Sequence, residues 1–315
     1  MTEGVIPPLG SQNLPDENTE EDLQASREAP VITTRIDDTR SYLRELELGG
    51  GRMSPLDRSK FYRYRQDIEE LRKFAREHEG DSEPLSLAII GCGNGEEPLS
   101  YLSALTAELP PGKNLNDRVR LHIIEVRPKE DISVQYGWGK VSKGGVSPLF
   151  LEGQEVPLIP RQPPKDLRQA FQLDESKGEY VFRDDIQSVM EKTMHDPQRG
   201  HFETPIENHL ADYPNQMYAV VACNNVLQHL GAGKEYPTPY RNPDLQPEAY
   251  ARFTEVVRGI LQCVQPGGLL ILHTDGANIM DAKGHASEKA LQLVPEFDSE
   301  FTEVATGVFR RNGKL

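Results

Sequence analysis

The segment LSLAIIGCGNGEEPLSY, from Leu85 to Tyr101, constrains the fold more than any other part of the chain. Its unbroken apolar start predicts a strand that is buried on both faces. Three glycines at alternate positions, Gly91 to Gly95, follow at once and predict a tight turn, after which the residues from about Glu96 to Leu109 suit a helix. A strand, a glycine turn and a helix in this order bring backbone amides up to a cofactor at the carboxyl end of a parallel sheet.

Strand-like and helix-like segments continue to alternate along the chain. Such an order is typical of an α/β fold, here a Rossmann-like domain with a mostly parallel sheet and helices on both faces. The segment from Phe301 to Arg311 predicts a C-terminal antiparallel hairpin. The other predicted strands are Val119 to Val126, Met217 to Val226 and Leu269 to Thr274, and the other predicted helices are Pro164 to Phe171, Asp184 to Met194 and Pro247 to Val264.

The composition divides the chain into regions. Residues 1–50 carry eleven acidic residues against four arginines and few large apolar ones, which predicts a largely disordered tail. Residues 51–80 predict an amphipathic helix that precedes the main domain and carries an excess of basic residues. Residues 81–315 are expected to form the main domain. Within that domain, residues 127–164 are rich in Gly and Pro and predict an irregular insertion.

Charge and cysteine content limit the classes of partner. The formal net charge of -15 argues against a protein that binds nucleic acid by neutralising phosphates. No run of about 18 apolar residues is present, so we expect no membrane insertion and, by default, a cytoplasmic protein. Cys92, Cys223 and Cys263 are spaced too widely for a metal clip, and we expect neither a disulfide nor a bound metal.

The residues after the glycines indicate which cofactor the turn suits. In a dinucleotide-binding fingerprint a third glycine would stand where this chain has Glu96, and a pyrophosphate would lie at the start of the helix. Glu96 and Glu97 would repel that phosphate, whereas they would attract a ligand that carries an ammonium and a sulfonium. S-adenosylmethionine is such a ligand. A glycine turn with a purely structural role is the alternative.

Polar residues end the next two predicted strands of the sheet. Glu125 lies where a carboxylate can accept hydrogen bonds from both ribose hydroxyls, although it could also be an ordinary strand-end charge, since Asp131 lies close behind. Asn224 and Asn225 lie where an amide could bind the cofactor's amino-acid or adenine part. A turn-forming role is equally open for Asn224, and we favour the binding role for Asn225.

Several segments resemble the CheR-type chemoreceptor glutamate methyltransferases. GCGNGEEPLSYLSAL, which starts at Gly91, is similar to that family's first motif, typically AGCSTGEEPYS, and ACNNVLQHL, which starts at Ala222, is similar to its CRNVLIYF. The similarity extends from about Phe61 to Arg311 through FYRYRQDIEELRKF, PKDLRQAFQLDESKGEYVFRDDIQ and ILQCVQPGGLLIL. GEEP is the specific part of the resemblance, and the other segments support it.

The resemblance implies a class I methyltransferase fold with a seven-stranded sheet, S-adenosylmethionine as cofactor, and methylation of a protein glutamate as the reaction. It places Arg65 where the family has an arginine near the cofactor, and Asn208 where the family has an Asn-Leu pair that contacts the cofactor. The expected catalytic residues are Arg65 and His229. Arg65 could orient the acceptor carboxylate, hold the cofactor's own carboxylate or be a solvated helix charge, and His229 could act as a base or only pack at the rim of the pocket. The expected cofactor-binding residues are Gly91, Cys92, Gly93, Gly95, Glu96, Glu125, Asn208, Asn225 and Val226.

The chain departs from the family in two places that bear on the methyl acceptor. The family's N-terminal helical domain, which docks receptor helices, is nearly absent and is replaced by the acidic tail, and His229 stands where the family's motif has a tyrosine. A glutamate acceptor is already ionised near neutral pH and needs no general base, whereas His229 could act as a base toward a hydroxyl or an amine. A methyltransferase for a small molecule or another protein is the first rival function, and a non-catalytic cofactor-binding sensor is the second.

Overall fold

The computed structural model describes the chain in ranges separated by gaps: residue 37 and residues 65–92, 95–109, 112–129, 148–151, 154–157, 169–174, 179–224, 226, 247–273, 291 and 294–313. Of the predicted acidic tail, only Asp37 lies within these ranges. The described helices are α3 (Arg65–Glu77), α4 (Glu96–Ala107), α6 (Asp184–His195), α7 (Ile206–Asp212) and α8 (Pro247–Gln262), with short 3-10 turns at η2 (Leu115–Asp117) and η6 (Pro295–Phe297). The described strands are β1 (Leu85–Ile90), β2 (Val119–Ile124), β3 (Pro148–Leu151), β4 (Gln154–Pro157), β5 (Phe171–Asp174), β6 (Glu179–Phe182), β7 (Gly200–His201), β8 (Tyr218–Asn224), β9 (Val264–His273), β10 (Phe301–Ala305) and β11 (Val308–Arg311).

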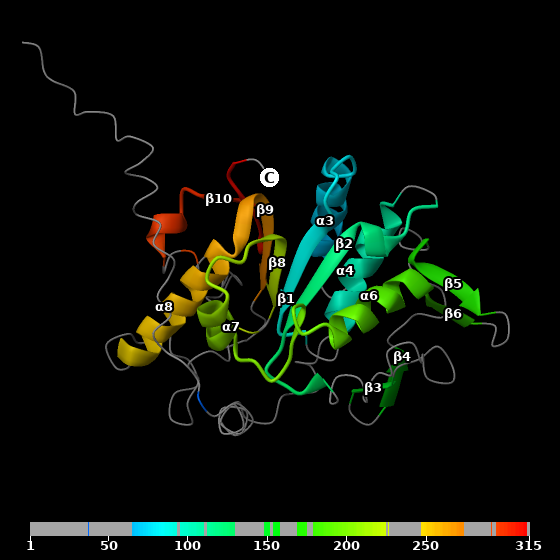
Figure 1. The fold of residues 1–315 in the computed structure, drawn as a ribbon, viewed down its shortest axis with the longest axis horizontal. Coiled ribbons are helices and arrows are strands. Elements are labelled where there is room, and N and C mark those ends of the chain that lie inside the picture. Colours follow the sequence, from blue (N-terminus) through cyan, green and yellow to red (C-terminus); the bar gives the residue numbers. More distant parts are fainter. Residues whose placement is uncertain are drawn as a thin grey trace, which may run out of the picture.

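One seven-stranded sheet organises the molecule, in the strand order β10-β11-β9-β8-β1-β2-β7 (Figure 1). The strands from β9 to β7 in this order are mutually parallel, and β11 runs antiparallel to both β9 and β10. This arrangement confirms the predicted fold class. The chain leaves β1 toward β2 and β7 on one side and later returns to β8 and β9 on the other. In open α/β sheets, ligands bind at the carboxyl ends of the strands at such a change of direction, here between β1 and β8.

The side chains of each central strand alternate between two apolar cores. Leu87 and Ile89 of β1 belong to a core that α3, α4 and α6 cover, whereas Ala88 and Ile90 belong to a core that α7 and α8 cover (Figure 1). Both faces of the sheet are therefore buried, which is why its strands are continuous apolar runs in the sequence. No helix within the described ranges is long and apolar enough to cross a membrane.

The structure describes only the end of the helix predicted for Pro164 to Phe171. Gln169 and Ala170 form a 3-10 turn, whereas Phe171 already begins β5, which pairs with β6 in an antiparallel hairpin. Phe171 lies opposite Phe182 in this hairpin, and their rings stack with centroids 4.8 Å apart. A cross-strand aromatic contact of this kind stabilises the hairpin.

The structure also moves the boundary between α8 and β9. The prediction ended the helix at Val264 and began the strand at Leu269, whereas α8 ends at Gln262 and β9 already begins at Val264. The pairing with β8 shifts register between Tyr218 and Val220, which accommodates the intervening Pro-Gly-Gly residues as a bulge. A Cβ on Gly268 would lie 2.8 Å from the carbonyl oxygen of Ala219, so glycine permits this close approach of the strands.

Parts of the fold were not predicted from the sequence. The short strand β7 and the helix α7 have no predicted counterpart, and the described part of the insertion at 127–164 contains the antiparallel hairpin of β3 and β4. The segments predicted as Leu85–Gly91, Glu96–Leu109, Val119–Val126, Asp184–Met194, Met217–Val226 and Phe301–Arg311 match β1, α4, β2, α6, β8 and the hairpin of β10 and β11 within a few residues.

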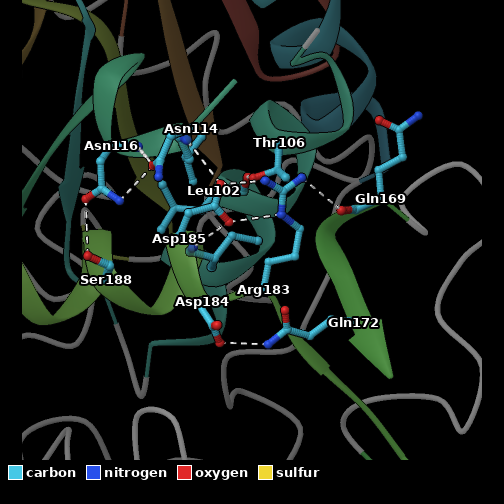
Figure 2. A network of polar contacts seen from close by, with 12 residues as sticks. Leu102, Thr106, Asn114, Asn116, Gln169, Gln172, Arg183, Asp184, Asp185 and Ser188 are labelled. Atoms are coloured by element: carbon cyan, nitrogen blue, oxygen red, sulfur yellow. Dashed lines mark hydrogen bonds and ion pairs between the residues drawn. The ribbon is translucent and has the colours of Figure 1, made fainter. Parts of the chain in front are cut away.

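A polar network joins the start of α6 to the turn that precedes β2 (Figure 2). Arg183 donates two hydrogen bonds to the carboxylate of Asp185, at 3.0 and 2.7 Å, and the same carboxylate accepts the backbone N–H of Leu115 at 3.1 Å. Gln172 of β5 donates to Asp184 at 2.7 Å. These contacts hold the β5–β6 hairpin and α6 against η2, so we assign the network a structural role.

Candidate functional site

The glycine turn after β1 has the geometry that its sequence predicts. Gly91 has φ +72° and donates its N–H to the carbonyl of Ile124 at 2.8 Å, which ties the turn to the end of β2. Gly95 has φ +95°, donates to the carbonyl of Cys92 at 2.9 Å and begins α4 as its N-cap. A Cβ on Gly91 would lie 2.2 Å from Cγ2 of Val226, so the turn touches the second residue after β8. Both φ values lie in the left-handed region that glycine adopts readily.

Glu125 lies next to this turn, directly after β2. Its side chain is 5% exposed, and its Oε2 accepts a weak hydrogen bond from the Cys92 thiol at 3.6 Å. Its Oε1 accepts the backbone N–H of Arg127 at 3.1 Å and faces that residue's Nε at 3.4 Å. The structure therefore brings together four residues predicted to bind the cofactor: Gly91, Cys92, Glu125 and Val226.

A second carboxylate, that of Glu97, also lies near the turn. Glu97 belongs to the first turn of α4, and its Oε1 accepts a hydrogen bond from Nδ2 of Asn224 at 2.7 Å. The field of both carboxylates reaches Cys92: burial raises the pKa of its thiol well above the ordinary value, and the charges of Glu125 and Glu97 raise that pKa further against the opposing charge of Arg127. The glycine turn thus lies in a negative environment.

Asn224 is held in place by its contacts within the protein. Besides Glu97, its Nδ2 donates to the hydroxyl of Tyr101 at 2.8 Å, and its Oδ1 accepts the backbone N–H of His273 at 3.2 Å. Its side chain lies at the same edge as the glycine turn, as the sequence predicted. Within the described part of the chain its contacts link α4, β8 and β9.

The sequence predictions gave no role to three residues of this edge, Asp67, Tyr101 and His273, although they placed His273 at the carboxyl end of its strand. Asp67 is 1% exposed, and its carboxylate contacts both Tyr101 and His273. One signal in the sequence could have identified it, because Asp67 lies beside Ile68 in α3, on the face of the helix that carries the apolar stripe. A carboxylate on an apolar stripe requires buried partners.

Two other predicted site residues lie on the helices α3 and α7, and the remainder lie outside the described part of the chain. Arg65 is at the start of α3, where its side chain is 83% exposed and pairs with Glu69 at 2.8 Å. Asn208 is half-buried in α7, which covers the opposite face of the sheet from α4. The residues outside the described part are Gly93, Asn225 and His229, together with the side chain of Glu96.

The described residues contain no group of three His, Cys, Asp or Glu side chains that could hold a metal ion. Cys92, Cys223 and Cys263 are all buried, and none of them forms a disulfide. Burial raises the pKa of each of these thiols, which keeps them protonated near neutral pH. We therefore assign none of the three a nucleophilic role.

Comparisons with known proteins give only distant likenesses. No protein-family model matches the chain, and no curated protein does so either. Among solved structures, an O-methyltransferase family protein from Burkholderia thailandensis has 12% identity and a TM-score of 0.37, covering 88% of this chain. The chain spans 61% of the length of that protein. The N-methyltransferase NodS from Bradyrhizobium japonicum WM9, in complex with S-adenosylhomocysteine, has 13% identity and a TM-score of 0.33. The matched region covers 87% of this chain and 99% of the NodS chain. The case for function accordingly rests on the site.

Proposed function

We propose that the chain is an S-adenosylmethionine-dependent methyltransferase. The observation that carries this proposal is that the carboxylates of Glu125 and Glu97 both lie close enough to the glycine turn to act on Cys92, at the change of direction between β1 and β8. Opposite charges attract and like charges repel most strongly where water is largely excluded. A site with this charge disfavours a pyrophosphate, and therefore a nicotinamide dinucleotide, and favours a cationic cofactor.

The residues present fit this cofactor. Gly91 and Gly95 have the positive φ values that a tight turn below a ligand requires, and the carboxylate of Glu125 can accept hydrogen bonds from two adjacent ribose hydroxyls. Cys92, Gly93 and Glu96 would line the turn, and Asn225 and Val226 would line the end of β8. Asn208 is proposed as a further contact on the resemblance to the CheR-type family alone.

We propose a protein glutamate carboxylate as the acceptor, on the strength of the GEEP segment and the wider resemblance. The cofactor supplies the methyl group as a sulfonium, with a neutral thioether as the leaving group. The protein then mainly has to align the acceptor and exclude water. An ionised acceptor oxygen would form the new C–O bond without giving up a proton. Arg65 could orient that carboxylate by a charge-assisted ion pair. To do so it would release its exposed ion pair with Glu69 and pair with the acceptor carboxylate instead.

Calorimetry tests the cofactor proposal directly. We expect the protein to bind S-adenosylhomocysteine and not NAD. Glu125→Gln removes the charge next to the turn and should weaken S-adenosylhomocysteine binding about tenfold, the effect of losing one charged hydrogen-bond acceptor. Glu191→Gln is a matched control, because Glu191 is an exposed carboxylate on α6. Binding of NAD alone would refute the proposal.

Transfer of a tritiated methyl group tests the acceptor. Labelled protein from a lysate would be treated with mild alkali, which releases methyl esters as volatile methanol and leaves N-methyl groups attached. Volatile label is the expected result, and Arg65→Ala should reduce it if Arg65 orients the carboxylate. Stable label would assign an amine acceptor and give His229 the role of base. No labelled product in lysates or small-molecule pools would favour a cofactor-binding sensor.

A further inference from the structure

Four side chains form a closed ring of hydrogen bonds at the carboxyl edge of the sheet. The ring consists of Asp67 from α3, Tyr101 from α4, Asn224 from β8 and His273 from β9. Asp67 Oδ1 lies 2.7 Å from His273 Nε2, and Asp67 Oδ2 accepts the Tyr101 hydroxyl at 3.2 Å. Asn224 closes the ring through Tyr101 at 2.8 Å and through the backbone of His273 at 3.2 Å. All four members are at most 8% exposed.

The directions of three of the four hydrogen bonds in the ring follow from chemistry. The backbone N–H of His273 can only donate, so the atom of Asn224 that faces it is the oxygen, and the NH2 group faces Tyr101. The Tyr101 hydroxyl accepts from this NH2 group and therefore donates to Asp67. Burial raises the pKa of Tyr101 well above its usual range, with further upward contributions from the charges of Asp67 and Glu97, so the hydroxyl keeps the proton that it donates.

The second hydrogen of the same NH2 group leaves the ring and reaches Glu97. It binds Glu97 Oε1 at 2.7 Å, and Glu97 is in the first turn of the helix that the glycine loop begins. With the amide reversed, the Asn224 oxygen would face the Glu97 carboxylate and repel it. The orientation of one buried amide thus decides whether Glu97 is attracted to its present position.

We infer that this ring positions Glu97 to bind the ammonium group of the cofactor, with Asp67 as a positioning residue that acts through Tyr101 and Asn224. The inference rests on the proposed function and adds to it a recognition role for Glu97. Asp67 contributes because its carboxylate accepts the hydrogen bond from the Tyr101 hydroxyl, which leaves the Tyr101 oxygen to accept from the amide. His273 supports Asp67, and its ring packs so closely on Gly307 that a Cβ there would lie 2.4 Å from Cε1.

The test compares two ligands that differ in the amino-acid part. S-adenosylhomocysteine carries the ammonium group, whereas 5′-methylthioadenosine has the same adenosine and sulfur without it. Asp67→Asn should weaken S-adenosylhomocysteine binding about tenfold and leave methylthioadenosine binding within about twofold, because one charged contact is lost from one ligand only. A general loss of folding or packing would weaken both ligands equally.

Two further variants keep the test decisive. Tyr101→Phe deletes the single oxygen that joins Asp67 to Asn224 and should give the same selective loss, even if Asp67→Asn fails to fold. Glu77→Gln is the matched control on α3, because Glu77 pairs with Arg310 at the other end of the helix, and it should change neither affinity. Equal weakening of both ligands, or no weakening of either, would overturn the inference. A wild-type protein that does not bind S-adenosylhomocysteine would instead refute the proposed function.

Discussion

Three histidines are buried together between the edge of the sheet and α7, and they should make the protein sensitive to mild acid. His201 of β7 lies against His209 of α7, with ring centroids 4.6 Å apart, and His122 of β2 packs edge-on against Tyr218 at 5.0 Å. Tyr218 also faces His209 Nε2 at 3.3 Å. One buried ring nitrogen on each histidine has no hydrogen-bond partner among the described residues. A proton on any of these rings would place an unsolvated charge in the core.

The size of the effect follows from the pKa values. Burial, reinforced by neighbouring cations, lowers the pKa of His122 from 6.5 to about 4, and burial lowers the pKa of His209 from 6.5 to about 3. Below pH 6.5 His122 and His209 bind protons in the unfolded chain but stay neutral in the folded chain until the pH approaches their lowered pKa values. Their contribution to the free energy of unfolding is therefore fully present above pH 6.5 and is lost as the pH falls. Between pH 7 and 5 each residue should remove about 2 kcal/mol, and the two together about 4 kcal/mol, from the free energy of unfolding.

His122→Phe isolates half of this effect. The variant keeps an aromatic ring against Tyr218 and removes one titrating group, so the loss of stability between pH 7 and 5 should shrink by about 2 kcal/mol. Urea unfolding followed by far-UV circular dichroism at pH 8, 7, 6 and 5 measures this difference, and the values at pH 8 correct for any change in packing. His195→Phe is the control, because His195 is exposed on α6 and should keep the wild-type dependence. Parallel curves for wild type and His122→Phe would refute the reasoning.

Two further predictions concern stability. Gly91→Ala should destabilise the protein by about 3 kcal/mol in urea unfolding, because it adds a Cβ 2.2 Å from Val226 at a left-handed φ, whereas Gly80→Ala, with nothing within 4 Å, should change stability by less than about 0.5 kcal/mol. Equal effects at both glycines would contradict the geometry of the turn. Arg252→Ala should cost about 3 kcal/mol, because Arg252 donates at 3.1 and 2.5 Å to Glu207, which is 0% exposed and would be left as an unpaired buried charge. Adding Glu207→Gln should restore part of that loss, and no recovery would show that the arginine acts through packing instead.

Much of the site could be predicted from the sequence because it depends on local order along the chain. The apolar run before Gly91 and the helix-forming residues after it specify a strand, a turn and a helix with little help from the rest of the protein. The carboxyl ends of parallel strands meet at one edge, so Glu125 and Val226 could be assigned to the same place as the turn before their contacts were known.

The tertiary structure decided the features that depend on distant partners. Asp67 and His273 are 206 residues apart, and their contact could not be derived from the neighbours of either residue. Phe171 begins a strand in which Phe182 is its cross-strand partner, 11 residues further along the chain. In each case the energy comes from burial and hydrogen bonding between segments that only the folded sheet brings together. The sequence by itself determined the strand, the glycine turn and the acidic start of α4. The packing of α3 against β9 brings Asp67 to His273, and their contact belongs to the hydrogen-bonded ring that holds Glu97.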